Sequence, residues 1–313
     1  MISGNATGCA ATRAVRFATL AIKPLMGRKT AIGVDIGGTS LRAARVGRDG
    51  AILAHASEPT DVQAPIPQVD RLVAAVDDGS AAAIGVGVPS RINSTTGEIY
   101  TGGFVDLSGP PLAGRLANPR KLPIIVENDG GMAMIAEARI GAARGLASAV
   151  MLTLGTGIGG GALLGGKLLR GRSTATEFGH IKVAWDGLPC VCGGIGCVET
   201  MSSGTGFRRH CREAGLPDST RAEDLLSRTD PVAREVIRRW IAPLRAGIDS
   251  LVAALDPEIA VLGGSLGHAA CMALPDFPTR SSWFPCPVVP AAVGGDAGVI
   301  GAGLAAYDLI KEQ

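Results

Sequence analysis

The stretch TAIGVDIGGTSLRAARVGRDGAILAHASE, residues 30–58, predicts three short strands joined by two tight turns. An apolar run over 30–36 ends at a pair of glycines, and a run of alternating character follows over 40–46. The sequence GRDG, residues 47–50, indicates a second turn before the third strand. The segment is therefore expected to form an antiparallel unit whose first turn is rich in glycine.

The same pattern returns in AVMLTLGTGIGGGALLGGKLLRG, residues 149–171, as strand, glycine-rich turn, strand, turn and strand. An internal repeat of one supersecondary unit predicts two α/β halves of similar build that face each other across a cleft. The spacing of apolar residues predicts the elements around the two units. Strands are expected within 81–90, 122–131 and 257–267, helices within 69–79, 132–145, 220–255 and 293–312, and a loop over the proline-rich 274–290.

Composition excludes several classes of protein. Hydrophobic residues make up 46% of the 313 residues, but no run of about 18 strongly apolar residues is free of glycine, proline or charge. We therefore expect no membrane-spanning helix. The 30 basic residues nearly balance the 28 acidic ones and aromatic residues are only 4%, so nucleic acid is not expected as a partner. Residues 1–28 lack the long apolar core of a secretory signal, and we expect them to be a disordered extension of a cytoplasmic protein.

Cysteines cluster in CVCGGIGCVE, residues 190–199, whereas the other four cysteines of the chain are scattered. Without a secretory signal the compartment is expected to be reducing, and clustered cysteines then indicate a metal site before disulfides. A redox pair is one alternative, although the C-x-x-C spacing is missing. A nucleic-acid-binding zinc finger is another, although the segment carries no basic residue.

Three glycine-rich turns follow predicted strands, at DIGGT (35–39), GTGIGGG (155–161) and LGGSLG (262–267). Glycine lets backbone N–H groups approach an anion without a Cβ in the way, so two facing turns could hold a phosphate chain between them. Each turn by itself is also typical of a plain hairpin. Asp35 beside the first turn is a candidate ligand for Mg²⁺, with an ordinary strand-end aspartate as the alternative.

VENDGG, residues 126–131, ends one predicted strand and begins a helix. The carboxylate of Asp129 is expected to meet the helix N-terminus, which favours its ionised form. It could accept the proton of a hydroxyl that attacks the γ-phosphate of ATP. A helix N-cap is the alternative role for the same side chain.

The order of these motifs, together with EFGH at 177–180, resembles the ROK family of sugar kinases and repressors, and especially its bacterial glucokinase and amino-sugar kinase branch. The most specific part is a histidine followed by C-x-C-G-x-x-G-C-x-E. The resemblance implies an α/β, two-domain actin-like ATPase fold, ribonuclease-H-like, with the active site in the interdomain cleft, and it suggests a homodimer. The corresponding domains are a smaller α/β domain over 29–125 plus 300–313 and a larger one, with a zinc loop, over 126–299.

The resemblance also implies roles for individual residues. Asp129 would be the base that activates the sugar 6-hydroxyl, and the other hydroxyls would be held by Asn128, Glu177, His180 and Glu199. ATP with its Mg²⁺ would be bound by Asp35, Gly37, Gly38 and Thr39, by Gly155, Thr156 and Gly157 across the cleft, and near the adenosine by Gly263 and Gly264. A structural Zn²⁺ would be held by His180, Cys190, Cys192 and Cys197, since three thiolates and one imidazole close a tetrahedral shell.

One segment departs from the family pattern. TGGFVD, residues 101–106, stands where family kinases usually have an asparagine that contacts the sugar near its 3-hydroxyl. Asp106 in this segment could pair with the ammonium group of an amino sugar, such as the 3-amino hexose kanosamine. The alternative is that Asp106 faces solvent in a turn and that the sugar is ordinary glucose.

The sequence therefore predicts an ATP-dependent kinase that phosphorylates the 6-hydroxyl of glucose or of a related amino hexose, such as kanosamine or glucosamine. A ROK-type sugar-responsive regulator is a second class, but residues 1–28 lack the room and pattern of a helix-turn-helix module. A non-catalytic sugar sensor is a third class. The presence of Asp35, Asp129 and both phosphate turns argues against a sensor.

Overall fold

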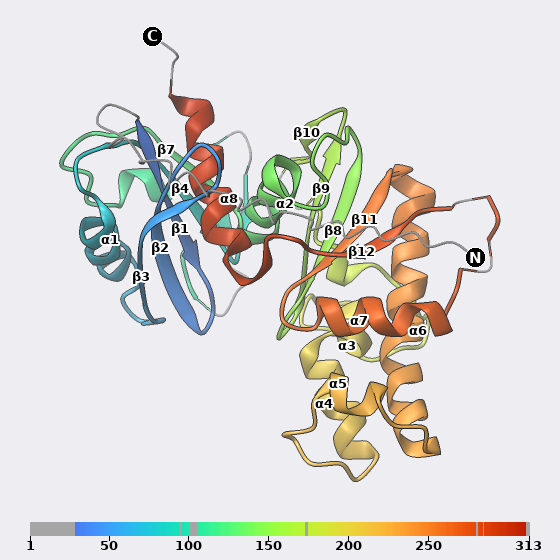
Figure 1. Ribbon diagram of the computed structural model, residues 1–313. Coiled ribbons are helices and arrows are strands. Elements are labelled where there is room, and N and C mark those ends of the chain that lie inside the picture. Colours follow the sequence, from blue (N-terminus) through green and yellow to red (C-terminus); the bar gives the residue numbers. More distant parts are fainter. Residues whose placement is uncertain are drawn as a thin grey trace, which may run out of the picture.

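The structure is a computed structural model that describes residues 29–93, 96–100, 105–172, 175–279, 281–283 and 285–310. Two five-stranded sheets lie on either side of two packed helices, α2 (Asp129–Ile140) and α8 (Ala297–Ala306), as Figure 1 shows. Strand order is β3-β2-β1-β4-β7 in the first sheet and β10-β9-β8-β11-β12 in the second. The same order in both sheets confirms the internal repeat that the sequence predicts.

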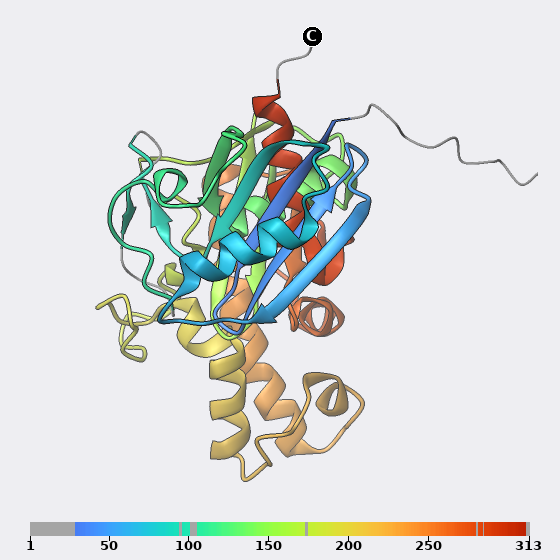
Figure 2. The same ribbon diagram turned by 90° about the vertical axis from the view of Figure 1, so that its left-hand side faces the viewer.

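The first sheet is built on the segment 30–58. Its strands are β1 (Thr30–Ile36), β2 (Ser40–Val46), β3 (Ile52–Pro59), β4 (Ala81–Val88) and β7 (Ile124–Asn128). β1 pairs antiparallel with β2 and parallel with β4, so its carboxyl end lies beside the carboxyl ends of β4 and β7. Helix α1 (Pro65–Val76), which begins at a proline, buries Val69, Leu72 and Val76 and lies across one face of this sheet (Figure 2).

The second sheet repeats this plan from β8 onward. Its strands are β8 (Ala149–Leu154), β9 (Ile158–Leu164), β10 (Lys167–Leu168), β11 (Ile259–Gly263) and β12 (Val288–Pro290). The prediction of a loop over 274–290 is wrong at its end, because β12 pairs in parallel with β11 as the edge strand. Proline is tolerated at the end of an edge strand, which explains why a proline-rich stretch still pairs. A separate small hairpin consists of β5 (Arg91–Ile92) and β6 (Ile99–Tyr100).

Helices α2 and α8 cross in close contact between the two sheets. Helix α8 has the sequence AGVIGAGLAA and is buried almost throughout, as expected for a helix that is apolar on every side. Gly301 lies at the crossing, where an added Cβ would come within 1.8 Å of the carbonyl oxygen of Met132. Only glycine therefore allows this approach of the two backbones.

Five more helices belong to the second half of the chain. They are α3 (Val198–Ser202), α4 (Gly204–Glu213), α5 (Ala222–Leu226), α6 (Pro231–Leu255) and α7 (Gly267–Ala273). The long helix α6 begins at Asp230, whose carboxylate accepts from the amide of Ala233 at 3.1 Å, and it buries Trp240 completely. The sequence-based assignment of helix over 220–255 is confirmed, whereas α3 and α4 were not predicted.

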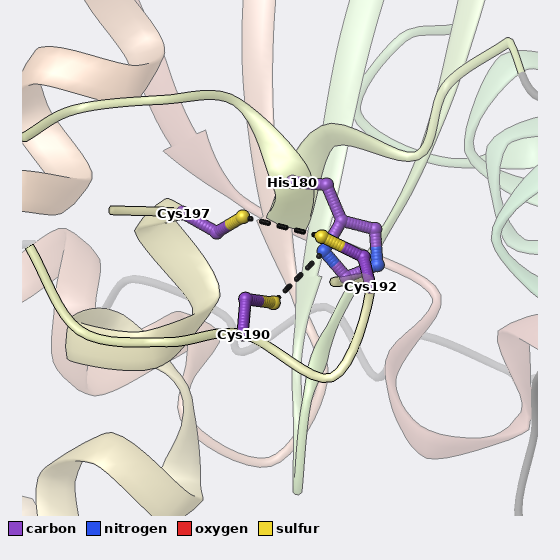
Figure 3. Close-up of side chains that lie close together, drawn as sticks. All are labelled: His180, Cys190, Cys192 and Cys197. Atoms are coloured by element: carbon purple, nitrogen blue, oxygen red, sulfur yellow. Dashed lines mark hydrogen bonds between the residues drawn. The ribbon is translucent and has the colours of Figure 1, made fainter. Parts of the chain in front are cut away.

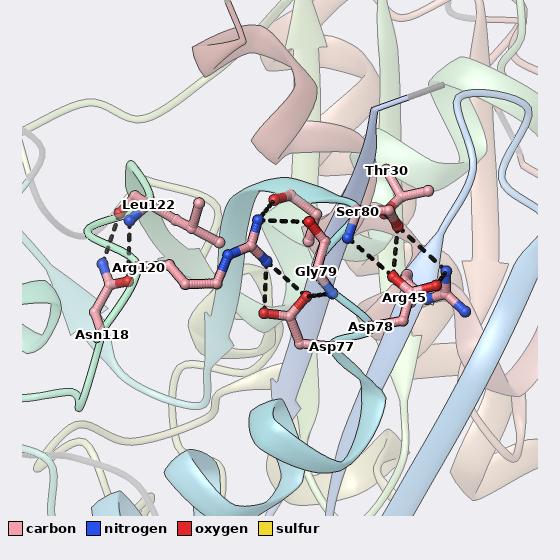
Figure 4. A network of polar contacts seen from close by, with 10 residues as sticks. Thr30, Arg45, Asp77, Asp78, Gly79, Ser80, Asn118, Arg120 and Leu122 are labelled. Atoms are coloured by element: carbon pink, nitrogen blue, oxygen red, sulfur yellow. Dashed lines mark hydrogen bonds and ion pairs between the residues drawn. The ribbon is translucent and has the colours of Figure 1, made fainter. Parts of the chain in front are cut away.

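A polar network closes the first sheet at the end remote from the carboxyl end of β1 (Figure 4). The guanidinium of Arg120 donates to both carboxylate oxygens of Asp77, at 2.7 and 2.6 Å, and to the carbonyl oxygens of Gly79 and Ala81, at 2.8 and 2.6 Å. Arg45 pairs with Asp78 beside it. These contacts hold the amino end of β4 in place, whereas its carboxyl end lies beside the carboxyl end of β1.

The predicted domain boundaries, the N-terminal extension and the absence of a membrane-spanning helix can be compared with the described residues. The predicted domain boundary at 125/126 falls inside β7 and the one at 299/300 falls inside α8, and the division into domains stays a prediction. The expected extension over 1–28 lies outside the described residues. Within the described part of the chain, none of the helices combines the length and the apolar character that a bilayer crossing requires.

Candidate active site

A cleft of about 790 Å³ lies where the carboxyl ends of the strands in both sheets meet. Its walls come from the turn after β1, the end of β7, the turn after β8 and the segment that precedes and includes the cysteine cluster. The predicted site residues that line it are Gly38, Thr39, Asn128, Asp129, Gly155, Thr156, Gly157, Glu177, His180, Cys192, Glu199 and Gly264. Residues more than 200 positions apart thus share one cavity.

Asn128, and not Asp129, caps helix α2. The side-chain oxygen of Asn128 accepts from the amides of Gly130 and Gly131, at 2.9 and 3.3 Å. Asp129 is the first residue of the helix, and its Oδ1 accepts from the amide of Gly130 at 2.7 Å. The N-cap alternative for Asp129 is therefore already filled by its neighbour, and the second oxygen of Asp129 has no partner among the described residues.

The ionisation of Asp129 is strongly perturbed. Burial, and then the negative charge of Asp35, raise the pKa of its carboxyl to about 7, although the hydrogen bond from Gly130 opposes the shift. Burial also raises the pKa of Asp35, against the opposing charge of Arg42. A carboxyl that lines a cleft and whose ionised form is disfavoured by burial and by a nearby carboxylate can accept a proton near neutral pH.

The three glycine-rich turns differ in what they contribute. In the first turn, residues 37–39, Gly38 and Thr39 line the cleft. Gly37 and Asp35, which lies near the end of β1 just before the turn, do not line it. The second turn, residues 155–157, lines it completely. In the third, Gly264 lines the cleft with a positive φ of 77°, but Gly263 ends β11 against the side chain of Met151. Gly263 therefore serves the packing of the second sheet.

A group of polar side chains lies beside Asp129 on the other side of the cleft from the first turn. Glu177 precedes a short 3₁₀ helix that carries His180, and Glu199 lies in α3. Burial raises the pKa of the Glu177 carboxyl, and the charges of His180 and Arg91 oppose the shift. Glu199 uses one oxygen, Oε2, to accept from the amide of Ile158 at 2.8 Å. The site thus combines three carboxyl groups with an amide and an imidazole.

Asp106 does not belong to this group, which corrects its expected role in substrate binding. Its side chain is exposed, and its Oδ1 accepts from the amide and the hydroxyl of Ser108, at 3.0 and 2.6 Å. These bonds lower the pKa of the carboxyl. The side chain is absent from the lining of the cleft. The alternative of an aspartate in a surface turn is therefore the one that the structure supports.

The cysteine cluster and His180 converge on one point (Figure 3). The ligand atoms of His180, Cys190, Cys192 and Cys197 all lie within 4.8 Å of one another. Nδ1 of His180 is 3.5 Å from Sγ of Cys190, and the sulfurs of Cys192 and Cys197 are 3.6 Å apart. A tetrahedral Zn²⁺ shell with Zn–S of about 2.3 Å has donor atoms separated by about 3.6–3.8 Å. The four side chains therefore form a group that could hold a metal ion, and the three cysteines are free thiols and not part of a disulfide.

A lysine that sequence reasoning missed lies against this cluster. Nζ of Lys182 donates to Sγ of Cys197 at 2.7 Å and lies 4.0 Å from Sγ of Cys192. The hydrogen bond to Cys197 raises the pKa of the ammonium group. Three thiolates around a divalent ion would carry one net negative charge, which an ammonium group at this place would compensate.

Ser90 and Arg91 are further lining residues that the sequence did not reveal. They follow β4, and the side-chain nitrogen Nδ2 of Asn128 donates to the carbonyl oxygen of Ser90 at 3.4 Å. The guanidinium of Arg91 lies 5.9 Å from the ring centre of Tyr100. A serine and an arginine after a strand carry no motif of their own, so only the fold could place them here.

Comparison with known proteins gives a consistent result. The model of the ROK family matches residues 31–308. The chain is 33% identical over 315 residues to a glucokinase of Streptomyces coelicolor, covering 90% of this chain and 97% of that one. It is 28% identical to an N-acetyl-D-glucosamine kinase of Yersinia pseudotuberculosis, covering 75% and 84%.

A solved structure of a ROK family glucokinase from Streptomyces griseus, in complex with glucose and AMPPNP, superposes with a TM-score of 0.78 at 31% identity. The superposition covers 89% of this chain and 99% of that one. The expected two-domain actin-like ATPase fold is thereby confirmed. The repeated sheet order and the cleft between the two halves agree with it.

Proposed function

This chain belongs to the ROK family and is an ATP-dependent sugar kinase, and we propose that it transfers the γ-phosphate of ATP to the 6-hydroxyl of a hexose, with Asp129 as the general base. One observation carries this assignment. Asp129 lines the cleft between the two halves, with one carboxylate oxygen bonded to the backbone and a pKa raised to about 7. A base works best when its pKa lies near the working pH.

The proposed step moves one proton and one phosphoryl group. The sugar 6-hydroxyl donates its proton to the carboxylate oxygen of Asp129 that has no partner among the described residues, while the oxygen of that hydroxyl attacks the γ-phosphorus. The bond between that phosphorus and the bridging oxygen breaks, and ADP leaves. Because little covalent chemistry falls to the protein in such transfers, positioning and charge stabilisation dominate.

The residues around Asp129 are suited to orient the sugar. The side-chain oxygen of Asn128 is used by the helix cap, so its amide nitrogen is the part that can donate to a hydroxyl. Glu177 and the second oxygen of Glu199 can accept from hydroxyls, and His180 presents the other side of its ring to the cleft. Such a set of donors and acceptors fixes one pose of a hexose.

The glycine turns are proposed to hold the nucleotide. Residues of the first and second turns line the same cleft, and backbone amides in glycine-rich turns suit a chain of phosphates. Asp35, half-buried near the end of β1 just before the first turn, is the proposed ligand of the Mg²⁺ that accompanies ATP, and this ion would neutralise charge on the phosphates. Gly264 would lie near the adenosine.

Zn²⁺ at His180, Cys190, Cys192 and Cys197 is proposed as a structural ion. The four positions of its shell are filled by protein atoms, so the ion supplies rigidity and no reaction step. His180 connects it to the sugar side of the cleft, and Cys197 lies two residues before Glu199. The cluster therefore acts by positioning these two side chains.

Glucose is the proposed substrate, ahead of an amino hexose. Asp106 was the residue expected to pair with the ammonium group of an amino sugar. It is exposed and bonded to Ser108, so it does not favour an amino sugar over glucose. We expect an ATP-consumption screen to give the highest kcat/KM with glucose among glucose, glucosamine, N-acetylglucosamine, N-acetylmannosamine and kanosamine. Asp106→Asn should leave that order unchanged. A preference for kanosamine that this substitution abolishes would restore the role of Asp106.

The raised pKa of Asp129 predicts a pH dependence. A general base must be ionised, so kcat/KM should rise with pH and level off above about pH 7. Below that value we expect a loss of about tenfold per pH unit. Because kcat/KM reports the free enzyme, it should be measured for the sugar at limiting MgATP. A profile that stays flat down to the usual range of an aspartate, about pH 4, would contradict the assignment.

A further inference from the structure

The second turn, residues 155–157, is held from outside by the segment 199–205 that follows the cysteine cluster. The amide of Gly204 donates to the carbonyl oxygen of Gly155 at 2.8 Å. The amide and the hydroxyl of Thr205 both donate to the carbonyl oxygen of Thr156, at 3.2 and 2.9 Å. The carboxylate of Glu199 accepts from the amide of Ile158, immediately after the turn. Four hydrogen bonds thus join the two segments.

The segment 199–205 is itself anchored on both sides. At its start, the carbonyl oxygen of Cys197 accepts from the amide and the hydroxyl of Thr200, at 3.1 and 2.7 Å. In its middle, Ser202 and Trp240 exchange hydrogen bonds of 2.7 and 2.8 Å, which fix α3 on α6. The segment is therefore bonded to the cysteine cluster and to α6 as well as to the turn.

Glu199 is part of this segment and also lines the cleft. Its Oε2 lies where a Cβ on Gly157 would come within 2.5 Å, so the carboxylate is packed directly against the turn. A sugar hydroxyl that binds the other oxygen restrains a side chain already bonded to the turn. The two proposed ligand sites therefore share one carboxylate.

We propose that the segment 199–205 couples sugar binding to nucleotide binding, with Glu199 as the shared contact and Thr205 as a positioning residue for the second turn. The inference rests on the proposed function for the identity of the two ligands. Restraint of Glu199 by the sugar orders the turn, and the turn then binds phosphate more tightly. Linkage requires the reverse effect to be of equal size, so the nucleotide must tighten sugar binding by the same factor.

Thr205 allows a clean test, because its exposed hydroxyl bonds the carbonyl of Thr156 and it does not line the cleft. We would measure the Kd of AMPPNP with Mg²⁺ by calorimetry, with and without saturating glucose, in Thr205→Val and Thr205→Ser. The matched control is Ser250→Ala, which removes another exposed hydroxyl bonded to a backbone carbonyl, on α6.

We expect glucose to lower the Kd of AMPPNP in the wild type. Thr205→Val should raise the Kd of AMPPNP about two- to tenfold, the usual effect of one lost hydrogen bond, and should reduce the effect of glucose on it. The Kd of glucose alone should not change, Thr205→Ser should restore the wild-type values, and Ser250→Ala should match the wild type.

Two results would overturn the coupling: a wild type in which glucose binds without changing the Kd of AMPPNP, or a valine variant equal to the wild type in both measurements. If Thr205→Val weakens AMPPNP binding and Thr205→Ser does not restore it, the role of the Thr205 hydroxyl would be overturned. Failure of the proposed substrate is distinguishable, because glucose would then show no binding of its own. The Kd of AMPPNP in the valine and serine variants would still decide the role of Thr205.

Discussion

Asp129→Asn is expected to lower kcat by about 10²–10⁴-fold while the fold and the affinity for sugar stay close to those of the wild type. The asparagine oxygen can still accept from the amide of Gly130, as Oδ1 of the aspartate does at 2.7 Å. The substitution removes the ability to take a proton. It also removes a charge that burial and Asp35 disfavour, so no loss of stability is expected.

The measurement is steady-state kinetics with glucose and ATP, together with a binding titration of glucose and a thermal melt. Asp106→Asn is the matched control, because it makes the same chemical change at an exposed aspartate outside the cleft. Its kcat should equal that of the wild type. Substantial turnover by Asp129→Asn, above about one tenth of the wild type, would refute the base.

Removal of the metal from the cysteine cluster should raise the Kd for sugar by about tenfold or more, or unfold the segment that carries the cluster. The reason is that the cluster positions two side chains that line the cleft, His180 and Glu199. His180 is both a member of the cluster and a wall of the cleft, and Cys197 is the N-cap residue of α3, which carries Glu199. Without the ion, three thiol groups and an imidazole no longer hold these segments together.

Zinc content, glucose affinity and circular dichroism should be measured before and after chelation, and in Cys197→Ser. Cys271→Ser is the control, since this cysteine lies in α7 outside the cluster and burial raises the pKa of its thiol to about 11. Its zinc content and affinity should not change. Metal-free protein that keeps its fold and binds glucose normally would refute the positioning role.

Much of the site could be predicted from the sequence because it lies in short, local patterns. The segment 30–58 and its repeat over 149–171 contain the strands and turns of both sheets, and each turn occurs where its glycines indicate. The cysteine spacing and His180 predicted a cluster that the structure brings within 4.8 Å. Local sequence is sufficient in these cases, because turn geometry and ligand spacing depend on residues close together in the chain.

Other features became defined only in the folded chain, some through local turns and some through distant segments, and sequence alone did not predict them. Asp106 had the right charge in the right segment, but its own turn with Ser108 holds it at the surface. Arg91 lines the cleft, although it belongs to no sequence motif. The sequence also left open which residue caps α2, and in the structure Asn128 does so.

By itself, the sequence determined the repeated strand-turn-strand units and the family, and through the resemblance to that family it predicted the cluster of His180 with three cysteines. The tertiary structure alone decided which carboxyls share the cleft and what surrounds them. The raised pKa of Asp129 comes from burial and from Asp35, which is 94 positions away in the chain. The support of the second turn comes from a segment more than 40 positions later. Burial and nearby charges act through space, so their effect on a carboxyl is fixed only when the two sheets fold around the same cleft.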